Sequence, residues 1–200
     1  MVNGGVAALC VFVAITQVPL LVDVRQETLH QRKKEAAILS GIADPAVLVQ
    51  MYSDPNMVRA QVALMKPARS SIFANAWANW LGSPISEIAA KSRSCEGHLD
   101  EVFPLASIGE WRARGWAWNT APGSVPSVVL LTDRNGTIVG YGRFGGQRPD
   151  VSQARSEVTE LVSGWVGYFS SPKGAPIEAF AFNEQAGTVC PLIVSARGWS

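Results

Sequence analysis

Hydrophobic and polar positions divide the 200-residue chain into three parts, of which the first is almost uncharged. No Asp, Glu, Lys or Arg precedes Asp23, and residues 5–22 are interrupted only by Thr16, Gln17 and Pro19. A helix of these 18 residues would be about 27 Å long, close to the ~30 Å apolar thickness of a bilayer. We therefore predict a membrane helix within residues 1–24.

Two other interpretations of this apolar run remain open. A cleaved signal peptide would need positive charge before the run and small residues after it. Residues 1–4 are uncharged, however, and Leu20-Leu21-Val22 is a poor cleavage site. The run could also be a buried helix of a soluble fold.

The second part, residues 25–94, carries the signals of short helices. Asp44 and Asp54 each precede a proline, which is typical of an N-cap followed by the first helical position. Apolar residues at spacings of three and four in residues 70–81 predict a helix with one aromatic face in the core. Further helices are expected at residues 27–41 and, more weakly, 85–91.

The third part, residues 95–200, changes to short β-branched runs separated by Gly and Pro. Asn135-Gly136 between two such runs is a strong hairpin signal, because a tight turn needs positive φ at both positions. Strands are expected at residues 127–131, 137–141, 158–169 and 176–182. The fold class predicted is α+β, with a small antiparallel β-sandwich, Ig-like or jelly-roll-like, after the helical region.

Charge and cysteine content bear on partners and location. The chain has 17 Lys and Arg against 16 Asp and Glu, a balance that excludes a typical nucleic-acid-binding protein. Basic residues follow the apolar run and none precedes it, which favours a cytoplasmic body by the positive-inside rule. They are Arg25, Arg32, Lys33 and Lys34.

The cysteines favour the opposite side of the membrane. Cys95 and Cys190 lie in the polar body, whereas Cys10 lies in the apolar run. Such a pair could form a disulfide in an oxidising compartment, or the two could be small buried apolar residues. We expect a single span in a bacterial inner membrane, with the soluble part in the periplasm.

Several short motifs resemble those of a known class of membrane protein. They include Gly115-Trp116-Ala117-Trp118, the run from Val128 to Gly140, Arg148-Pro149-Asp150-Val151 and Ser163-Gly164-Trp165-Val166-Gly167-Tyr168. Residues 25–192 resemble the C-terminal region, a helical linker plus a β-sandwich module, of bacterial multi-spanning membrane proteins of the surface-polysaccharide glycosyltransferase type. The resemblance brings no catalytic residues with it, and this chain has only one candidate span.

Arg148, Asp150, Trp116 and Trp118 are the candidate ligand-binding residues. Proline between Arg148 and Asp150 could hold a bidentate ion pair that fixes the loop. Alternatively, the pair and a neighbouring tryptophan could bind sugar, since aromatic faces and planar hydrogen-bonding groups suit a carbohydrate ring. No catalytic residue is identified by these patterns.

Other motifs are weak. Residues 140–145 fit G-x-G-x-x-G, but a loop follows where a dinucleotide site needs a helix, so we expect no cofactor. Asp133 to Gly136 resembles the start of a calcium loop, but Phe144 occupies the position of the required Glu. Cys95 and His98 lack the further ligands of a zinc site, and no metal site is expected.

The function expected from these observations is that of a non-catalytic, membrane-tethered envelope module. It would bind glycan or position a partner, such as a polytopic membrane protein, in cell-surface polysaccharide metabolism. Two alternatives remain. The chain could be a C-terminal piece of a membrane glycosyltransferase-like protein, or a thioredoxin-like domain, because residues 125–136 resemble that fold but no C-x-x-C is present.

Overall fold

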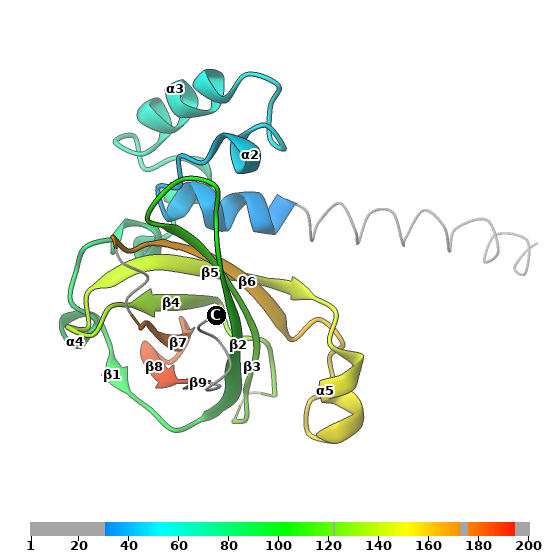
Figure 1. The fold of residues 1–200 in the computed structure, drawn as a ribbon. Coiled ribbons are helices and arrows are strands. Elements are labelled where there is room, and N and C mark those ends of the chain that lie inside the picture. The colour runs from blue at the N-terminus through cyan, green and yellow to red at the C-terminus, as the bar shows by residue number, and fades with distance from the viewer. Residues whose placement is uncertain (1–30, 122, 173–175, 195–200) are drawn as a thin grey trace, which may run out of the picture.

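The computed structural model describes residues 31–121, 123–172 and 176–194 and shows helices packed on a curled sheet (Figure 1). After helical residues 31–39, the helical elements are α2 (Pro45–Leu48), α3 (Pro55–Met65), the 3₁₀ turns η1 (Ser71–Phe73) and η2 (Ala76–Asn79), α4 (Ile85–Ile88) and α5 (Pro149–Ala154). The strands are β1 (Ala90–Lys91), β2 (Cys95–Pro104), β3 (Glu110–Asn119), β4 (Val128–Thr132), β5 (Ile138–Gly146), β6 (Gly164–Ser170), β7 (Glu178–Asn183), β8 (Thr188–Pro191) and β9 (Ile193–Val194).

The predicted membrane helix within residues 1–24 lies outside the described residues. None of the helices in the described ranges combines the length and apolarity needed to cross a bilayer. The α+β class predicted from the sequence is confirmed, with strands dominating the fold.

All nine described strands belong to one sheet, in the order β1-β8-β7-β4-β5-β6-β3-β2-β9. The long strands pair antiparallel, and only the short pairs β1 with β8 and β2 with β9 are parallel. The sheet curls so that its two ends come close together. At one end β8 pairs with β7, and only Leu192 separates β8 from β9, which pairs with β2 at the other end. The Ig-like or jelly-roll-like sandwich expected from the sequence is therefore replaced by a single curled sheet.

Small residues on the inner face explain why one sheet suffices. Leu99, Phe144, Trp165 and Phe169 fill the interior, and alanines such as Ala113 lie between them. At Gly115 a Cβ atom would clash with the carbonyl oxygen of His98 and the ring of Trp165. Glycine and alanine at such positions let strands bend tightly around a few large side chains.

The outer face is covered by the helical region. Val128, Leu130 and Tyr141 of the sheet pack against Phe73 and Trp77. The Tyr141 hydroxyl donates a 2.9 Å hydrogen bond to the carbonyl oxygen of Trp77. Residues far apart in the chain thus share one buried cluster on this face. The thioredoxin-like alternative expected a mixed sheet with helices on both faces, whereas here β4 pairs antiparallel on both sides and its inner face lines the interior.

The N-caps predicted from the Asp-Pro pairs are confirmed. Asp44 accepts the N–H of Ala46 at the start of α2, and Asp54 accepts the N–H of Asn56 at the start of α3. Both carboxylates satisfy N–H groups that a helix start leaves without partners.

The helix predicted over residues 70–81 is wrong in its geometry, and its predicted apolar face is right except for Ala76, which is exposed. Two 3₁₀ turns replace the helix, although Phe73 and Trp77 are buried as expected. The Asn79 amide donates to the carbonyl oxygens of Phe73 and Asn75 at 3.2 and 3.3 Å. Such side-chain bonds to nearby carbonyls compete with a regular helix.

Strand predictions hold with shifted bounds. The predicted hairpin joins β4 to β5, but only Gly136 of the Asn135-Gly136 pair has positive φ, at 78°. The Asp133 carboxylate closes the turn by accepting the N–H groups of Asn135 and Thr137, each at 2.9 Å. The strand predicted over residues 158–169 begins only at Gly164, and the one at 176–182 corresponds to β7.

Candidate functional site

Trp116 and Trp118, predicted as open sugar-binding faces, are buried instead. Their side chains lie on the outer face of β3 beneath α5, in a cluster with Val151 and Val158, and are 6% and 1% exposed. The ring of His98 also stacks on Trp116, with 5.7 Å between centroids. Because both faces are covered by protein, the two tryptophans build the support for α5 and do not present a surface to a ligand.

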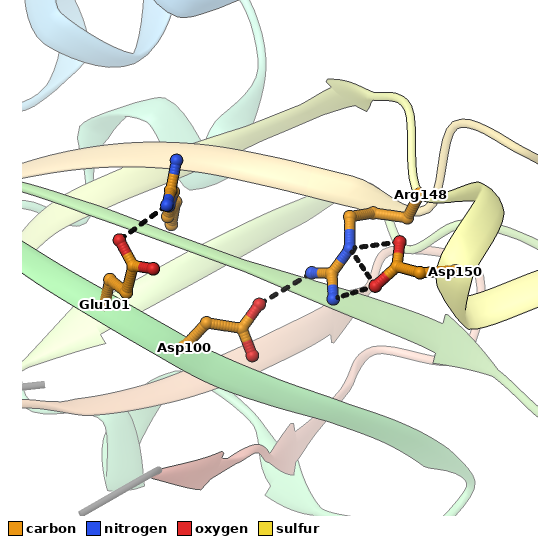
Figure 2. A network of polar contacts seen from close by, with 5 residues as sticks. Asp100, Glu101, Arg148 and Asp150 are labelled. Atoms are coloured by element: carbon orange, nitrogen blue, oxygen red, sulfur yellow. Dashed lines mark hydrogen bonds and ion pairs between the residues drawn. The ribbon is translucent and has the colours of Figure 1, made fainter. Parts of the chain in front are cut away.

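Arg148 and Asp150, the other predicted pair, do come together. The Nε and Nη2 atoms of Arg148 lie 3.0 and 2.9 Å from the two carboxylate oxygens of Asp150 (Figure 2). The Nη1 atom reaches the carboxylate of Asp100 on β2 at 2.6 Å. One guanidinium therefore joins the start of α5 to a strand 48 residues earlier in the chain.

The ion pairs shift the pKa values of both partners. The hydrogen bond from Arg148 lowers the pKa of the Asp150 carboxyl below its usual value. The same bond to Asp150, with a further one to Asp100, raises the pKa of Arg148 although burial opposes this. Both shifts favour the charged forms of Arg148 and Asp150.

A β-bulge in β2 positions the acidic residues. The pairing of β2 with β3 shifts register between Leu99 and Glu101. Leu99 and Val102 both belong to the interior cluster, so two consecutive residues, Asp100 and Glu101, lie between inward positions. An inserted residue commonly re-aims side chains in this way. Figure 2 shows both carboxylates on the same side of β2.

Alternating residues of β3 supply the cations. Ala113 lies in the interior cluster, whereas Arg112 and Arg114 on either side of it are exposed on the outer face. Arg114 pairs with Glu101 at 2.6 Å, and both guanidinium groups lie over the ring of Phe103, 5.2 and 5.3 Å from its centroid. The aromatic ring restricts both arginines to this face of the sheet.

Two hollows open on this outer face and meet at Arg114 and Val166, which line both. The hollow toward α5 has a volume of about 550 Å³ and includes Asp100, Glu101 and Arg148. The other has a volume of about 520 Å³ and extends beneath residues 31–50. We call the combined depression the charged trough; its defining residues are Lys33, Lys34, Asp100, Glu101, Arg112, Arg114, Arg148, Val166 and Tyr168.

The charged trough offers hydrogen-bonding groups held in place by their own ion pairs. Arginines supply planar donors and carboxylates supply acceptors, while Val166 and Tyr168 add apolar surface. Such a surface can bind a polar, elongated molecule along its length. Within residues 31–121, 123–172 and 176–194, no group of three or more His, Cys, Asp or Glu residues is placed to hold a metal ion.

Cys95 and Cys190 form a disulfide, with 6.0 Å between their Cα atoms. The bond joins the first residue of β2 to β8, close to where β9 pairs with β2. The disulfide therefore fastens the closure of the sheet and lies apart from the residues of the charged trough.

Sequence reasoning did not find Asp100, Glu101, Arg112 and Arg114. The first pair carried a weak signal, since Leu-Asp-Glu-Val places two charges between apolar residues. The second pair carried a clearer one, because Arg112 and Arg114 alternate with apolar or small residues over residues 111–115, which is typical of a strand. The tryptophans of the same strand were predicted as ligand-binding residues in place of its arginines.

Comparison of the chain with models of protein families, with curated proteins and with solved structures found no match. The resemblance to the C-terminal region of bacterial surface-polysaccharide glycosyltransferase-type proteins thus stays a prediction.

Proposed function

We propose that this protein is a non-catalytic, membrane-tethered module of the bacterial cell envelope that binds a glycan strand in the charged trough. The anchor would be the apolar run of residues 5–22, and the sheet would lie on the periplasmic side. Glycan binding would position surface polysaccharide, or a partner that handles it. The continuity of the two hollows through Arg114 and Val166 is the observation that carries this proposal.

The chemistry of the trough supports a glycan ligand. Adjacent hydroxyl groups on a sugar ring both donate and accept hydrogen bonds, so they pair well with planar arginine and carboxylate groups. Arg148 is held by Asp100 and Asp150, and Arg114 by Glu101, before any ligand arrives. Side chains fixed in this way lose little conformational entropy on binding.

The disulfide supports the periplasmic placement. Disulfides persist in oxidising compartments such as the bacterial periplasm and are rare in the cytosol. The bond between Cys95 and Cys190 encloses most of the sheet, with 95 residues of sequence separation. Because a disulfide needs an oxidising compartment, we give it more weight than the basic residues after the apolar run when we propose the orientation of the chain.

An array of neutral and acidic bacterial surface glycans, probed with the full chain, tests this proposal. The discriminating variants are Arg114→Ala and Arg155→Ala. Both arginines pair with glutamates and have similarly exposed side chains, 54% and 48%, but only Arg114 lines the trough. We expect wild-type protein and Arg155→Ala to bind the same glycans and Arg114→Ala to lose most of that binding. Absence of binding to any glycan, or equal binding by the two variants, would overturn the proposal.

A further inference from the structure

We propose that Lys33, Lys34 and Arg112 form an anion subsite at one end of the charged trough, so that the module selects acidic glycans over neutral ones. The group recognised would be an oxyanion carried by the glycan, such as a sugar carboxylate. This inference rests on the proposed glycan binding and adds the chemical class of the ligand.

Three cations from two distant segments converge on the same hollow. Lys33 and Lys34 belong to helical residues 31–39, and Arg112 lies on β3, yet all three line the hollow of about 520 Å³. Within the described part of the chain, none of them has a carboxylate within ion-pair distance. Most other arginines on this side of the sheet are paired with carboxylates. The three cations of this hollow are not, so the hollow keeps a positive charge that no ion pair neutralises.

The acidic residues near this hollow are engaged elsewhere. Asp44 lines it but is only 1% exposed, and its two oxygens accept the N–H groups of Ala46 and Ser107, each at 2.8 Å. Burial works to raise the pKa of Asp44, but these backbone donors outweigh it and hold the pKa below its usual value. Glu110 accepts the N–H groups of Ala43 and Asp44 at 2.8 and 2.9 Å.

Glu101 lines the adjoining hollow and is paired with Arg114. Glu35, next to Lys34 in the sequence, is paired with Arg143. An incoming oxyanion would therefore meet three cations without competition from a free carboxylate of the described chain. Arg112 is also held over the Phe103 ring, which fixes its plane and leaves its edge N–H groups for a ligand. Tyr168 adds a hydroxyl donor, and burial raises its pKa, so the hydroxyl stays protonated.

The test is a calorimetric titration of the full chain at low salt with two matched probes, hexagalacturonate and its methyl ester. The two oligosaccharides share a backbone and differ at the carboxyl groups, which are charged in the acid and carry an uncharged methyl ester in the other probe. We expect the acid to bind at least about tenfold more tightly, because a charge-assisted hydrogen bond is worth about that factor. The preference should shrink as salt is added, because exposed charges are screened.

Charge-matched double variants locate the subsite. Lys33→Gln with Arg112→Gln removes two cations from the hollow, and Lys66→Gln with Arg134→Gln removes two exposed cations that do not line it. The first pair should abolish the preference for the acid, because binding of the acid falls much more than binding of the ester, whereas the second should retain the preference.

Four results would contradict the anion subsite. Equal binding of acid and ester, or equal losses in the two double variants, would overturn it and leave glycan binding intact. If inorganic phosphate displaces the hexamer at an equal concentration, the three cations bind a free anion and do not select acidic glycans. Binding of neither oligosaccharide, together with an empty glycan array, would overturn the proposed function as well.

Discussion

Arg148 connects two segments of the molecule, the start of α5 and β2, through one side chain. It donates to Asp150 in the next turn and to Asp100 on β2, and its own backbone lies at the start of α5. The bidentate pair within Arg148-Pro149-Asp150 could be predicted from the sequence because the two residues are close together in it. The Asp100 contact depends on a β-bulge, which a single sequence does not indicate.

The Asp150 pair predicts a pH-dependent contribution to stability. The carboxyl pKa is lower in the folded state than its usual value of 3.8, so the pair stabilises above that value. The contribution disappears as pH falls through the folded pKa. Asp150→Asn should lower the free energy of unfolding at pH 7 by about 0.5 kcal/mol, a small value because the side chain is 63% exposed.

Urea unfolding of wild type and Asp150→Asn from pH 7 to pH 2.5 measures this effect. The difference between them should be constant to about pH 5 and vanish near the lower limit. Glu160→Gln is the matched control, since Glu160 is exposed and its side chain has no partner in the described chain. A difference for Asp150→Asn that persists at pH 2.5 would contradict the ion pair.

Two helices begin at Asp-Pro pairs, but the two caps differ in what else they hold. Asp44 caps α2 and also accepts the N–H of Ser107 in the loop between β2 and β3. Asp54 caps α3 alone and is exposed. The first cap therefore ties the helical region to the sheet, whereas the second serves only its own helix.

Substitution of the two caps should separate these roles. Asp54→Ala should cost about 1 kcal/mol in the free energy of unfolding, as for an ordinary N-cap. Asp44→Ala should cost about 2–3 kcal/mol, because it also leaves the Ser107 N–H without its partner. Chemical denaturation of both variants checks the order, and equal losses would show that the contact with Ser107 adds nothing.

Local signals in the sequence predicted elements better than they predicted packing. Asp44 and Asp54 cap helices as expected, and Asn135-Gly136 lies in the predicted hairpin turn although only Gly136 has positive φ. These signals work because their effects extend over only a few residues. The strand over residues 176–182 was also right, with Ala179 and Ala181 inside and Phe180 and Phe182 outside. The choice between a sandwich and one curled sheet depends on pairings between distant strands, such as β9 with β2.

The same limit explains the candidate site. Trp116 and Trp118 looked like ligand-binding residues because nothing in the sequence shows that α5 covers them. Arg112 and Arg114 looked ordinary, because their role depends on helical residues 31–39 lying across the same face of the sheet. In both cases the role of the residue depends on which distant element lies over it. A local sequence pattern contains no information about that element.

At the scale of the whole molecule, the closure of the sheet depends on the disulfide between Cys95 and Cys190. Loss of a bond that closes a loop of this size should lower the free energy of unfolding by about 2–5 kcal/mol. We expect Cys95→Ala and reduced wild-type protein to lose the same amount, and reductant to leave Cys95→Ala unchanged. Urea unfolding with and without reductant measures both losses.

Thiol titration provides the check on that result. Of the three cysteines, only Cys10 should react in the denatured, unreduced chain, and all three after reduction. Three reactive thiols before reduction would contradict the disulfide and remove its support for a periplasmic location.

Glycan binding in the charged trough can be followed through the side-chain NMR signals of its arginines. The measurement follows the Nε–Hε resonances of the full chain while a glycan selected on the array is added. We expect the signals of Arg112, Arg114 and Arg148 to shift with a common affinity, and those of Arg134 and Arg155, which do not line the trough, to stay unchanged. Saturating binding that leaves the trough arginines unshifted would contradict glycan binding in the trough.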